Sequence, residues 1–201
     1  MNISEEKIGY RKGGELDYKL IRILKQGGIV AMRTDTVYGL LTPAFSRDSV
    51  EELYRIKMRS EGKPFIILIS SFEMLKRFPV EIHSPTLRLL EDMWPGELSA
   101  ILPLKKDSVG LEEFYYLHQG KEGIAFRIPN DSLLRKVVSL VGPLVAPSAN
   151  LEGGKPAQSI DEVIEYFGDT LSFYEDGGVC SDISVSRIIS FLDGEEGRYL
   201  R

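Results

Sequence analysis

Short apolar runs that alternate with helix-periodic segments constrain this chain more than any other feature of its sequence. Apolar runs of strand length are found at residues 28–33, 65–69, 98–104, 124–128, 143–146, 171–174 and 186–191. Apolar residues recur at helical spacing at about residues 16–27, 48–57, 72–78, 85–93, 131–142 and 159–167. Such alternation predicts an α/β fold in which helices flank a sheet. The two successive helical segments at 72–93 disfavour a plain doubly wound pattern.

Several predicted helix ends carry capping residues. Ser49 with Glu52 and Ser159 with Glu162 have the spacing of a capping box, and Asp131 stands at the N-cap of a third helix. Gly27 and Gly142 stand where helix C-terminal caps are expected. Residues 105–122 are polar and contain glycines, which predicts a loop.

Size and charge limit the function classes. With 201 residues and 43% hydrophobic residues, the chain is expected to form one compact domain over residues 1–201. The formal net charge is −5, which argues against a general RNA coat. Any contact with RNA would therefore need a local basic patch.

Cysteine and histidine are scarce. Cys180 is the single cysteine, and no stretch has the apolar run of a signal peptide or of a membrane span of about 20 residues, so we predict a cytoplasmic protein. His83 and His118 are the only histidines, which makes a zinc site or a Cys–His nucleophile a weak hypothesis. We expect both histidines at the surface.

Four basic residues cluster at the end of the second predicted helix: Arg55, Lys57, Arg59 and Lys63. Such a cluster neutralises a triphosphate, but a helix C-terminus also attracts basic residues through its dipole. Lys57 continues the inward stripe of the helix, which favours the functional interpretation.

Polar residues follow two of the apolar runs. Ser148 and Asn150 come after the run at 143–146, at the end of a strand where open α/β sheets present ligand-binding groups. Thr34, Asp35 and Thr36 follow the run at 28–33. Side chains of both sets bind ligands or instead form turns by bonding their own backbone, and the sequence leaves both interpretations open.

Arg127 interrupts the apolar run at 124–128. A buried, unpaired charge is very unfavourable, so its guanidinium must reach water, an acidic side chain or an anionic ligand. Carboxylate binding and a structural salt bridge are equally good interpretations of this residue.

Five motifs in order resemble the YrdC-like threonylcarbamoyl-adenylate synthases, from about residue 17 to the end of the chain. They are RTDTVYGL at 33–40, KMRSEGKP at 57–64, WPGELS at 94–99, AFRIP at 125–129 and APSAN at 146–150. The resemblance implies a twisted, mixed parallel and antiparallel sheet flanked by helices, an open α/β fold with a concave basic cleft. It also implies a reaction that joins L-threonine, bicarbonate and ATP with Mg²⁺ and releases pyrophosphate. The product would serve tRNA modification, with local contact to tRNA or to tRNA-modifying proteins.

The resemblance also implies roles for particular residues. Thr34, Arg127 and Ser186 fall where the family contacts threonine. The positions that match its ATP contacts are Lys57, Arg59, Lys63, Ser148, Asn150 and Arg198, of which Lys57 and Arg59 are the predicted catalytic residues. No residue is predicted to bind a metal directly. Because Lys57 would stabilise charge on the phosphates, Lys57→Ala is expected to abolish turnover with little loss of fold.

This sequence departs from the family pattern at several motif positions. Arg33 replaces a proline, Glu97 and Ser99 stand where proline and threonine are common, Glu152 replaces a serine, and residues 184–190 lack the usual threonine and aspartate. Two other functions therefore remain: a double-stranded RNA or tRNA-binding module of the same fold, and a fold relative with a different nucleotide or amino acid ligand.

Overall fold

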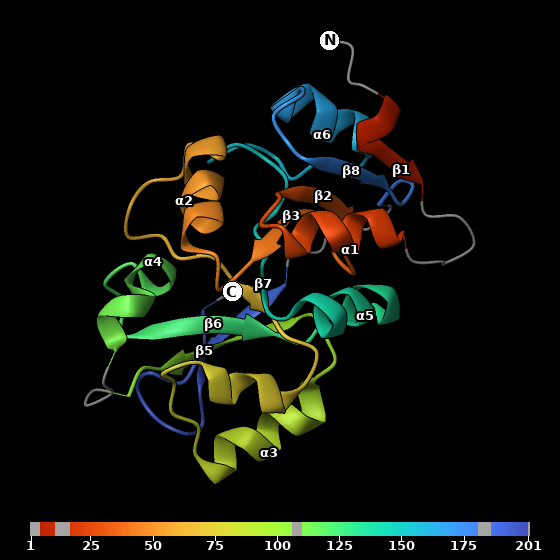
Figure 1. Ribbon diagram of the computed structural model, residues 1–201. Coiled ribbons are helices and arrows are strands. Elements are labelled where there is room, and N and C mark those ends of the chain that lie inside the picture. Colours follow the sequence, from red (N-terminus) through yellow and green to blue (C-terminus); the bar gives the residue numbers. More distant parts are fainter. Residues whose placement is uncertain (1–4, 11–16, 106–109, 181–185, 201) are drawn as a thin grey trace.

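The computed structural model describes residues 5–10, 17–105, 110–180 and 186–200. Their strands join in one sheet with the order β1-β8-β2-β3-β7-β4-β6-β5-β9-β10 (Figure 1). The strands are β1 Ile8–Tyr10, β2 Val30–Arg33, β3 Tyr38–Pro43, β4 Ile67–Leu68, β5 Leu98–Pro103, β6 Gly123–Arg127, β7 Leu144–Val145, β8 Phe173–Asp176, β9 Arg187–Ser190 and β10 Arg198–Tyr199.

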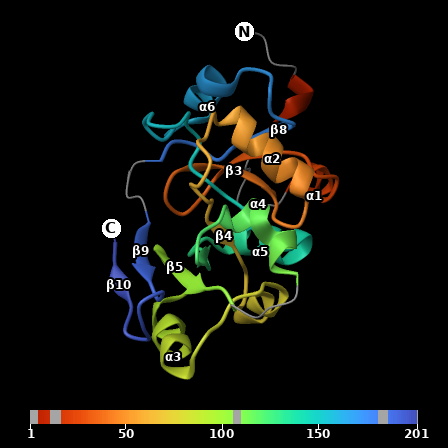
Figure 2. The ribbon, with the colours of Figure 1, turned by 90° about the vertical axis from the view of Figure 1, so that its left-hand side faces the viewer.

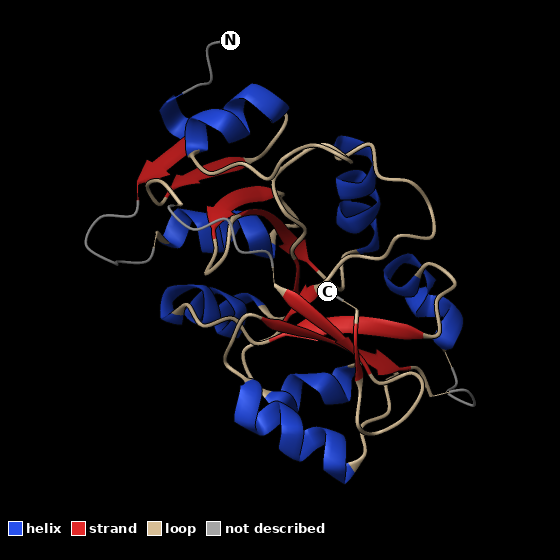
Figure 3. Cartoon of the chain, turned by 180° about the vertical axis from the view of Figure 1, so that it is seen from behind, coloured by secondary structure: helices blue, strands red, loops and turns tan. Residues whose placement is uncertain are grey.

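Helices lie on both sides of this sheet (Figure 3). The α-helices are α1 Tyr18–Lys25, α2 Arg47–Ile56, α3 Ser84–Met93, α4 Tyr115–His118, α5 Ser132–Val141 and α6 Ile160–Phe167. Short 3₁₀ helices are found at η1 Glu5–Lys7, η2 Phe72–Arg77 and η3 Leu111–Phe114. No helix in the described ranges is both long and apolar enough to span a membrane.

The sheet is mixed, as predicted. Strand β8 pairs in parallel with β1 and β2, and β4–β6 and β5–β9 are parallel pairs as well. The β2–β3, β3–β7, β4–β7, β5–β6 and β9–β10 pairs are antiparallel. Strands β3 and β7 join an upper group of strands to a lower group, and Figure 2 shows β9 and β10 at the far edge beside β5.

Alternate residues of the strands enter two separate hydrophobic cores. Ala31 and Leu40 belong to a core that includes residues of α2, α3, α4 and α6. Their neighbours Met32 and Leu41 belong to a second core with residues of α1 and α5. Because successive side chains of a strand point to opposite faces, the two cores are the two faces of the sheet. The predicted α/β architecture is therefore confirmed.

The structure confirms some predicted helix ends and corrects one. The Asp131 side chain accepts a hydrogen bond from the Leu134 N–H (2.9 Å) at the start of α5, and Ser159 caps α6 in the same way through the Glu162 N–H (3.3 Å). The predicted capping box at Ser49 is wrong because α2 begins earlier, after Ser46. The Ser49 hydroxyl instead donates to the Gly27 carbonyl (2.7 Å) and joins α2 to the end of α1.

Two further predictions are wrong in the described residues. The segment at 105–122, expected to be a loop, contains η3 and α4, which bury Tyr116 and Leu117 against the core. His118 at the end of α4 is only 6% exposed, whereas His83 is exposed as expected. Strands β1, β3 and β10 were not predicted. Of these, β3 matters most because it follows directly on the turn at 34–37.

Candidate functional site

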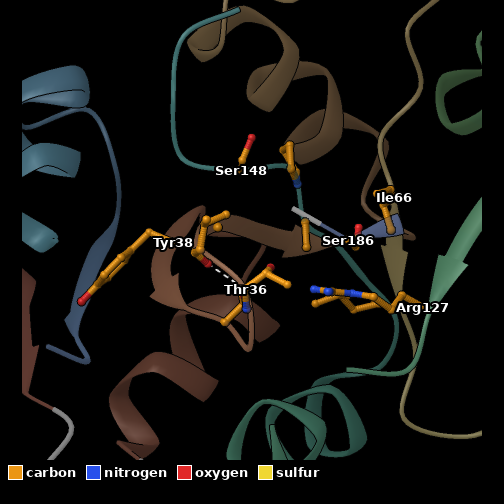
Figure 4. Close-up of a pocket in the computed structure, with 12 residues that line it drawn as sticks. Thr36, Tyr38, Ile66, Arg127, Ser148 and Ser186 are labelled. Atoms are coloured by element: carbon orange, nitrogen blue, oxygen red, sulfur yellow. Dashed lines mark hydrogen bonds between the residues drawn. The ribbon is translucent and has the colours of Figure 1, made fainter. Parts of the chain in front are cut away.

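A small cavity lies where the two groups of strands meet. Its volume is about 110 Å³. Its walls come from the turn and strand start at 34–39, from Ile66 and Leu68 at β4, from Arg127 at the end of β6, from residues 146–148 after β7, and from Ser186 before β9 (Figure 4). The structure therefore brings Thr34, Arg127, Ser148 and Ser186, all predicted site residues, to one cavity.

The turn between β2 and β3 is held by its own threonines. The Thr34 hydroxyl donates to the Val37 carbonyl (2.6 Å) and lies 3.1 Å from the Thr36 hydroxyl oxygen. The Thr36 N–H donates to the Thr34 hydroxyl oxygen (3.2 Å). Thr34 is therefore a turn former, and it still lines the cavity. Of the two interpretations that the sequence had left open, the turn-forming one is confirmed, and the ligand-binding one stays a prediction.

Arg127 is the most informative residue of the cavity. Its side chain is 6% exposed, and its Nη2 lies 3.0 Å from Asp35 Oδ1 in a buried ion pair. Within the described residues, Arg127 Nε and Nη1 are buried and have no hydrogen-bond partner. Burial lowers the pKa of Arg127, while Asp35 and Glu97 oppose that shift. Figure 4 shows the guanidinium directed toward Thr36, so donors remain for an anion in the cavity.

Asp35 is fixed on its other side. Its Oδ2 accepts a hydrogen bond from the Asn130 N–H (2.7 Å), which joins the turn to the segment after β6. The structural salt bridge and the free donors thus coexist on Arg127. Sequence reasoning had placed Asp35 in the turn but had not paired it with Arg127, because the two residues are far apart along the chain.

Lys57 stabilises the segment that follows β7. Lys57 is 1% exposed, and its Nζ donates to the carbonyls of Ser148 and Asn150, both at 2.5 Å. Burial, helped by the nearby Arg59 charge, lowers the pKa of Lys57 to about 7, and Glu152 opposes the shift. Lys57 and Asn150 are not among the residues that line the cavity. Lys57 therefore meets this segment through its backbone.

Asn150 also bonds its own loop. Its Nδ2 donates to the carbonyls of Leu151 (2.6 Å) and Gly154 (3.0 Å), and its Oδ1 accepts from the Ser148 hydroxyl (2.6 Å). The interpretation of Asn150 as a residue that ends a strand through local hydrogen bonds describes these contacts. Ser148 differs, because it lines the cavity as well.

The remaining predicted ATP residues lie outside the cavity. Arg59 Nε donates to the Lys63 carbonyl (2.8 Å), and the guanidinium stacks over the Phe65 ring at 5.0 Å. Lys63 is exposed and forms an ion pair with Glu152. Arg198 is 70% exposed on β10 and lies 3.4 Å from Asp193. Arg59 and Lys63 belong to one loop at residues 58–64, whereas Arg198 belongs to the C-terminal hairpin.

Some cavity residues carry no sequence signal. Ile66 and Leu68 read as ordinary strand residues, although they form a wall of the cavity.

Tyr38 is fully buried, and its hydroxyl donates to the Gly178 carbonyl (2.8 Å) and accepts from the Gly177 N–H (3.0 Å). Figure 4 shows its ring directed away from Arg127. Tyr38 thus links β3 to the glycine segment that follows β8.

Some of the residues that depart from the family pattern make defined contacts in the structure. The Arg33 guanidinium donates to the Gly177 carbonyl (2.9 Å), and the Arg33 N–H donates to the buried Glu175 carboxylate (3.2 Å). The Ser99 and Ser186 hydroxyl oxygens lie 3.0 Å apart in the core beside the cavity. Residues 184 and 185 of the altered stretch lie outside the described residues.

Comparison with known proteins identifies the family. The chain belongs to the Sua5/YciO/YrdC family, whose model, described as telomere recombination, matches residues 22–201. A threonylcarbamoyl-AMP synthase from Pyrococcus abyssi is 33% identical over 156 residues, 77% of this chain and 44% of that protein. One from Marinobacter nauticus is 30% identical over 177 residues, 86% of this chain and 89% of that protein.

Solved structures agree with this assignment. The crystal structure of P. abyssi Sua5 complexed with L-threonine has a TM-score of 0.82 and 29% identity, and the match covers 96% of this chain and 56% of that one. Escherichia coli YciO, at 19% identity and a TM-score of 0.76, shares the fold. The chain spans about half the length of the P. abyssi and Bacillus subtilis relatives, 44% and 49% respectively.

Proposed function

We propose that this protein is an L-threonylcarbamoyladenylate synthase that uses L-threonine, bicarbonate and ATP. The observation that carries the proposal is the pair of unpartnered, buried donors on Arg127 in a cavity with Thr34, Ser148 and Ser186. A guanidinium with free N–H groups is the preferred protein partner of a carboxylate. We assign this carboxylate to L-threonine. The assignment is supported by the relatives named threonylcarbamoyl-AMP synthase and by the Sua5 structure complexed with L-threonine.

The size of the cavity supports a small ligand. Pockets that enclose drug-sized ligands usually measure about 300–1,000 Å³. The volume of about 110 Å³ here is well below that range, so it suits an amino acid better than a nucleotide. We therefore place ATP outside this cavity, with Lys63 of the loop at 58–64 as one of its predicted contacts.

The proposed chemistry consists of two balanced steps. The threonine amine combines with bicarbonate to give the carbamate and water. A carbamate oxygen then attacks the α-phosphorus of ATP, a new P–O bond forms, and the bond to the bridging oxygen breaks with its electrons leaving on pyrophosphate. Holding the two reactants in line supplies much of the rate, because proximity contributes about 7–11 kcal/mol in favourable cases. Arg127 fixes the amino acid for this approach.

Magnesium enters the proposal as a partner of ATP. No group of three or more His, Cys, Asp or Glu side chains in the described ranges is arranged to hold a metal ion. Mg²⁺ commonly binds through substrate phosphates and water, with few protein ligands. We therefore place it on the triphosphate, where it would neutralise charge that develops on pyrophosphate.

Pyrophosphate release is the decisive measurement. We expect release only when threonine, bicarbonate, ATP and Mg²⁺ are all present, together with a product that has the mass of threonylcarbamoyl-adenylate. Four reactions that each omit one component are the controls. Absence of product with all four present would contradict the proposal. A panel of other amino acids and nucleotides, followed by thermal shift, then identifies the ligand of a fold relative with a different substrate.

Use of the product in tRNA modification belongs to the same proposal, as do a cytoplasmic location and contact with tRNA. An RNA-binding module of this fold would instead bind tRNA or double-stranded RNA in a salt-sensitive manner, without nucleotide turnover. Filter binding at two salt concentrations, carried out beside the pyrophosphate assay, separates the two functions.

A further inference from the structure

The loop between α2 and β4 is folded so that several hydrogen-bond donors meet on one acidic side chain. Arg59 closes the loop by donating to the carbonyls of Lys63 (2.8 Å) and Pro64 (3.4 Å). Gly62 has a φ of 74°, a conformation that favours glycine. The Ser60 N–H, the Ser60 hydroxyl and the Lys63 ammonium group then all reach Glu152.

Glu152 uses both of its oxygens in this contact. Its Oε2 accepts from the Ser60 N–H and from the Ser60 hydroxyl, both at 2.7 Å, and its Oε1 pairs with Lys63. Hydrogen bonds from Lys63 and Ser60 lower the pKa of Glu152 to about 2, so it is ionised at neutral pH. A backbone amide, a hydroxyl and an ammonium group are also the donors that proteins offer to phosphate oxygens.

We propose that the Glu152 carboxylate occupies donors on Ser60 and Lys63 that also bind the triphosphate of the nucleotide. The triphosphate must displace this carboxylate when it binds, so Glu152 sets the affinity for ATP. The nucleotide's identity rests on the proposed function. Two anions cannot use one set of donors, and their like charges repel each other. The bound carboxylate therefore competes with phosphate, and it lowers the affinity for ATP and for departing pyrophosphate alike.

The surroundings of Glu152 leave room for this displacement. Its side chain is 22% exposed, so water is available to the carboxylate when it leaves the loop. Gly153 follows with a φ of 80°, and no atom lies within 4 Å of the position that a Cβ would occupy there. The position after Glu152 is thus open, while the Glu152 backbone N–H stays bonded to the Lys57 carbonyl (3.2 Å).

Binding of inorganic tripolyphosphate to the full chain, measured by titration calorimetry, tests the proposal. We expect Glu152→Gln to bind the polyanion roughly tenfold more tightly than the wild type, which corresponds to about 1.4 kcal/mol. Glu73→Gln is the matched control, because it also removes one carboxylate charge from a lysine ion pair, that of Lys76 on η2. Melting temperatures of both variants establish that they are folded.

Each result decides the question. Unchanged or weaker binding by folded Glu152→Gln would overturn the proposal, and so would an equal gain in Glu73→Gln, since that gain would reflect net charge alone. Lys63→Gln should weaken binding, and it should abolish most of the gain when combined with Glu152→Gln.

The assay needs neither threonine nor turnover. Tighter binding by the variant, with no adenylate formed by the wild type, would therefore overturn only the proposed function. Adenylate formation with unchanged polyanion binding would overturn only the competition.

Discussion

Arg127 and Lys57 are both buried cations beside the segment after β7, yet their hydrogen bonds differ. Lys57 directs its Nζ to two backbone carbonyls, whereas Arg127 keeps Nε and Nη1 unpartnered among the described residues. Burial and charge alone therefore do not distinguish a cation that holds the fold from one that binds a ligand. The donors left over after the fold has formed make that distinction, and they favour Arg127 as the ligand-binding residue.

The largest effect is expected at Arg127. Arg127→Met leaves the Asp35 carboxylate buried without its cation, which should lower the free energy of unfolding by about 3–5 kcal/mol. Urea denaturation measures this loss. Asp35→Asn in the same chain should restore much of the stability without restoring threonine binding, as calorimetry would show. Threonine binding of wild-type strength in the double variant would leave Arg127 only a structural role.

Lys57 should affect stability next. Lys57→Met leaves the carbonyls of Ser148 and Asn150 without their donor, and we expect a loss of about 2 kcal/mol in the free energy of unfolding. This expectation differs from the prediction from the sequence, in which Lys57→Ala abolishes turnover with little loss of fold, because the structure gives Lys57 two buried backbone contacts. Lys76→Met, at an exposed lysine, is the control and should unfold like the wild type. Equal stability of Lys57→Met and the control would contradict the structural role.

The pH dependence of the free energy of unfolding tests the role of Lys57 further. The pKa of Lys57 is about 7 in the folded protein and 10.5 in the unfolded chain, so the unfolded state binds more protons between these values. The contribution of Lys57 is therefore complete above pH 10.5 and is lost as the pH falls to about 7. The free energy of unfolding should rise above pH 7 by up to about 1.4 kcal/mol per pH unit. Denaturation curves of Lys57→Met should lack this component; an identical slope would place the titration elsewhere.

A smaller effect is expected at Tyr38. Tyr38→Phe removes the hydroxyl that joins β3 to Gly177 and Gly178, at a loss of about 1 kcal/mol in the free energy of unfolding. Because the ring and its packing remain, threonine binding should change little. Tyr54→Phe is a matched control, since its hydroxyl makes one long hydrogen bond, to the Lys63 carbonyl (3.3 Å). A Tyr38→Phe variant as stable as that control would contradict the expected link.

The smallest change in stability is expected at Arg198. Its side chain is exposed, so Arg198→Ala should alter the free energy of unfolding by less than about 0.5 kcal/mol. If the predicted ATP contact exists, the KM for ATP should rise while the stability stays constant. Initial rates over a range of ATP concentrations measure this. An unchanged KM would remove Arg198 from the nucleotide site.

Most of the fold could be predicted because buried apolar residues recur in the sequence at the spacing of a helix or a strand. The strands around Met32, Ile101 and Phe126 and the helices capped by Asp131 and Ser159 were all found from local pattern. Strand β3 was missed because its buried residues follow a turn motif directly, with no polar break between them. Helix α4 was missed because its four residues are too few to show a helical period in the sequence.

The site could be predicted only in part, because the sequence does not show the tertiary contacts of long side chains. The sequence indicates which residues are polar and follow strands, and Thr34, Arg127 and Ser148 do line one cavity. It does not indicate which backbone carbonyl a long side chain will reach. The bond from Lys57 to the segment after β7 therefore could not be predicted, because it depends on tertiary structure, whereas the local bonds of Asn150 were one of the two interpretations that the sequence offered.

The cavity wall that Ser186 contributes has a consequence for the order of folding. The opposite wall begins at Thr34, so the two sides are separated by most of the polypeptide. Closing so long a loop comes late, because its entropy must be overcome before the contacts form. A growing chain on the ribosome would thus complete this cavity only after Ser186 had emerged.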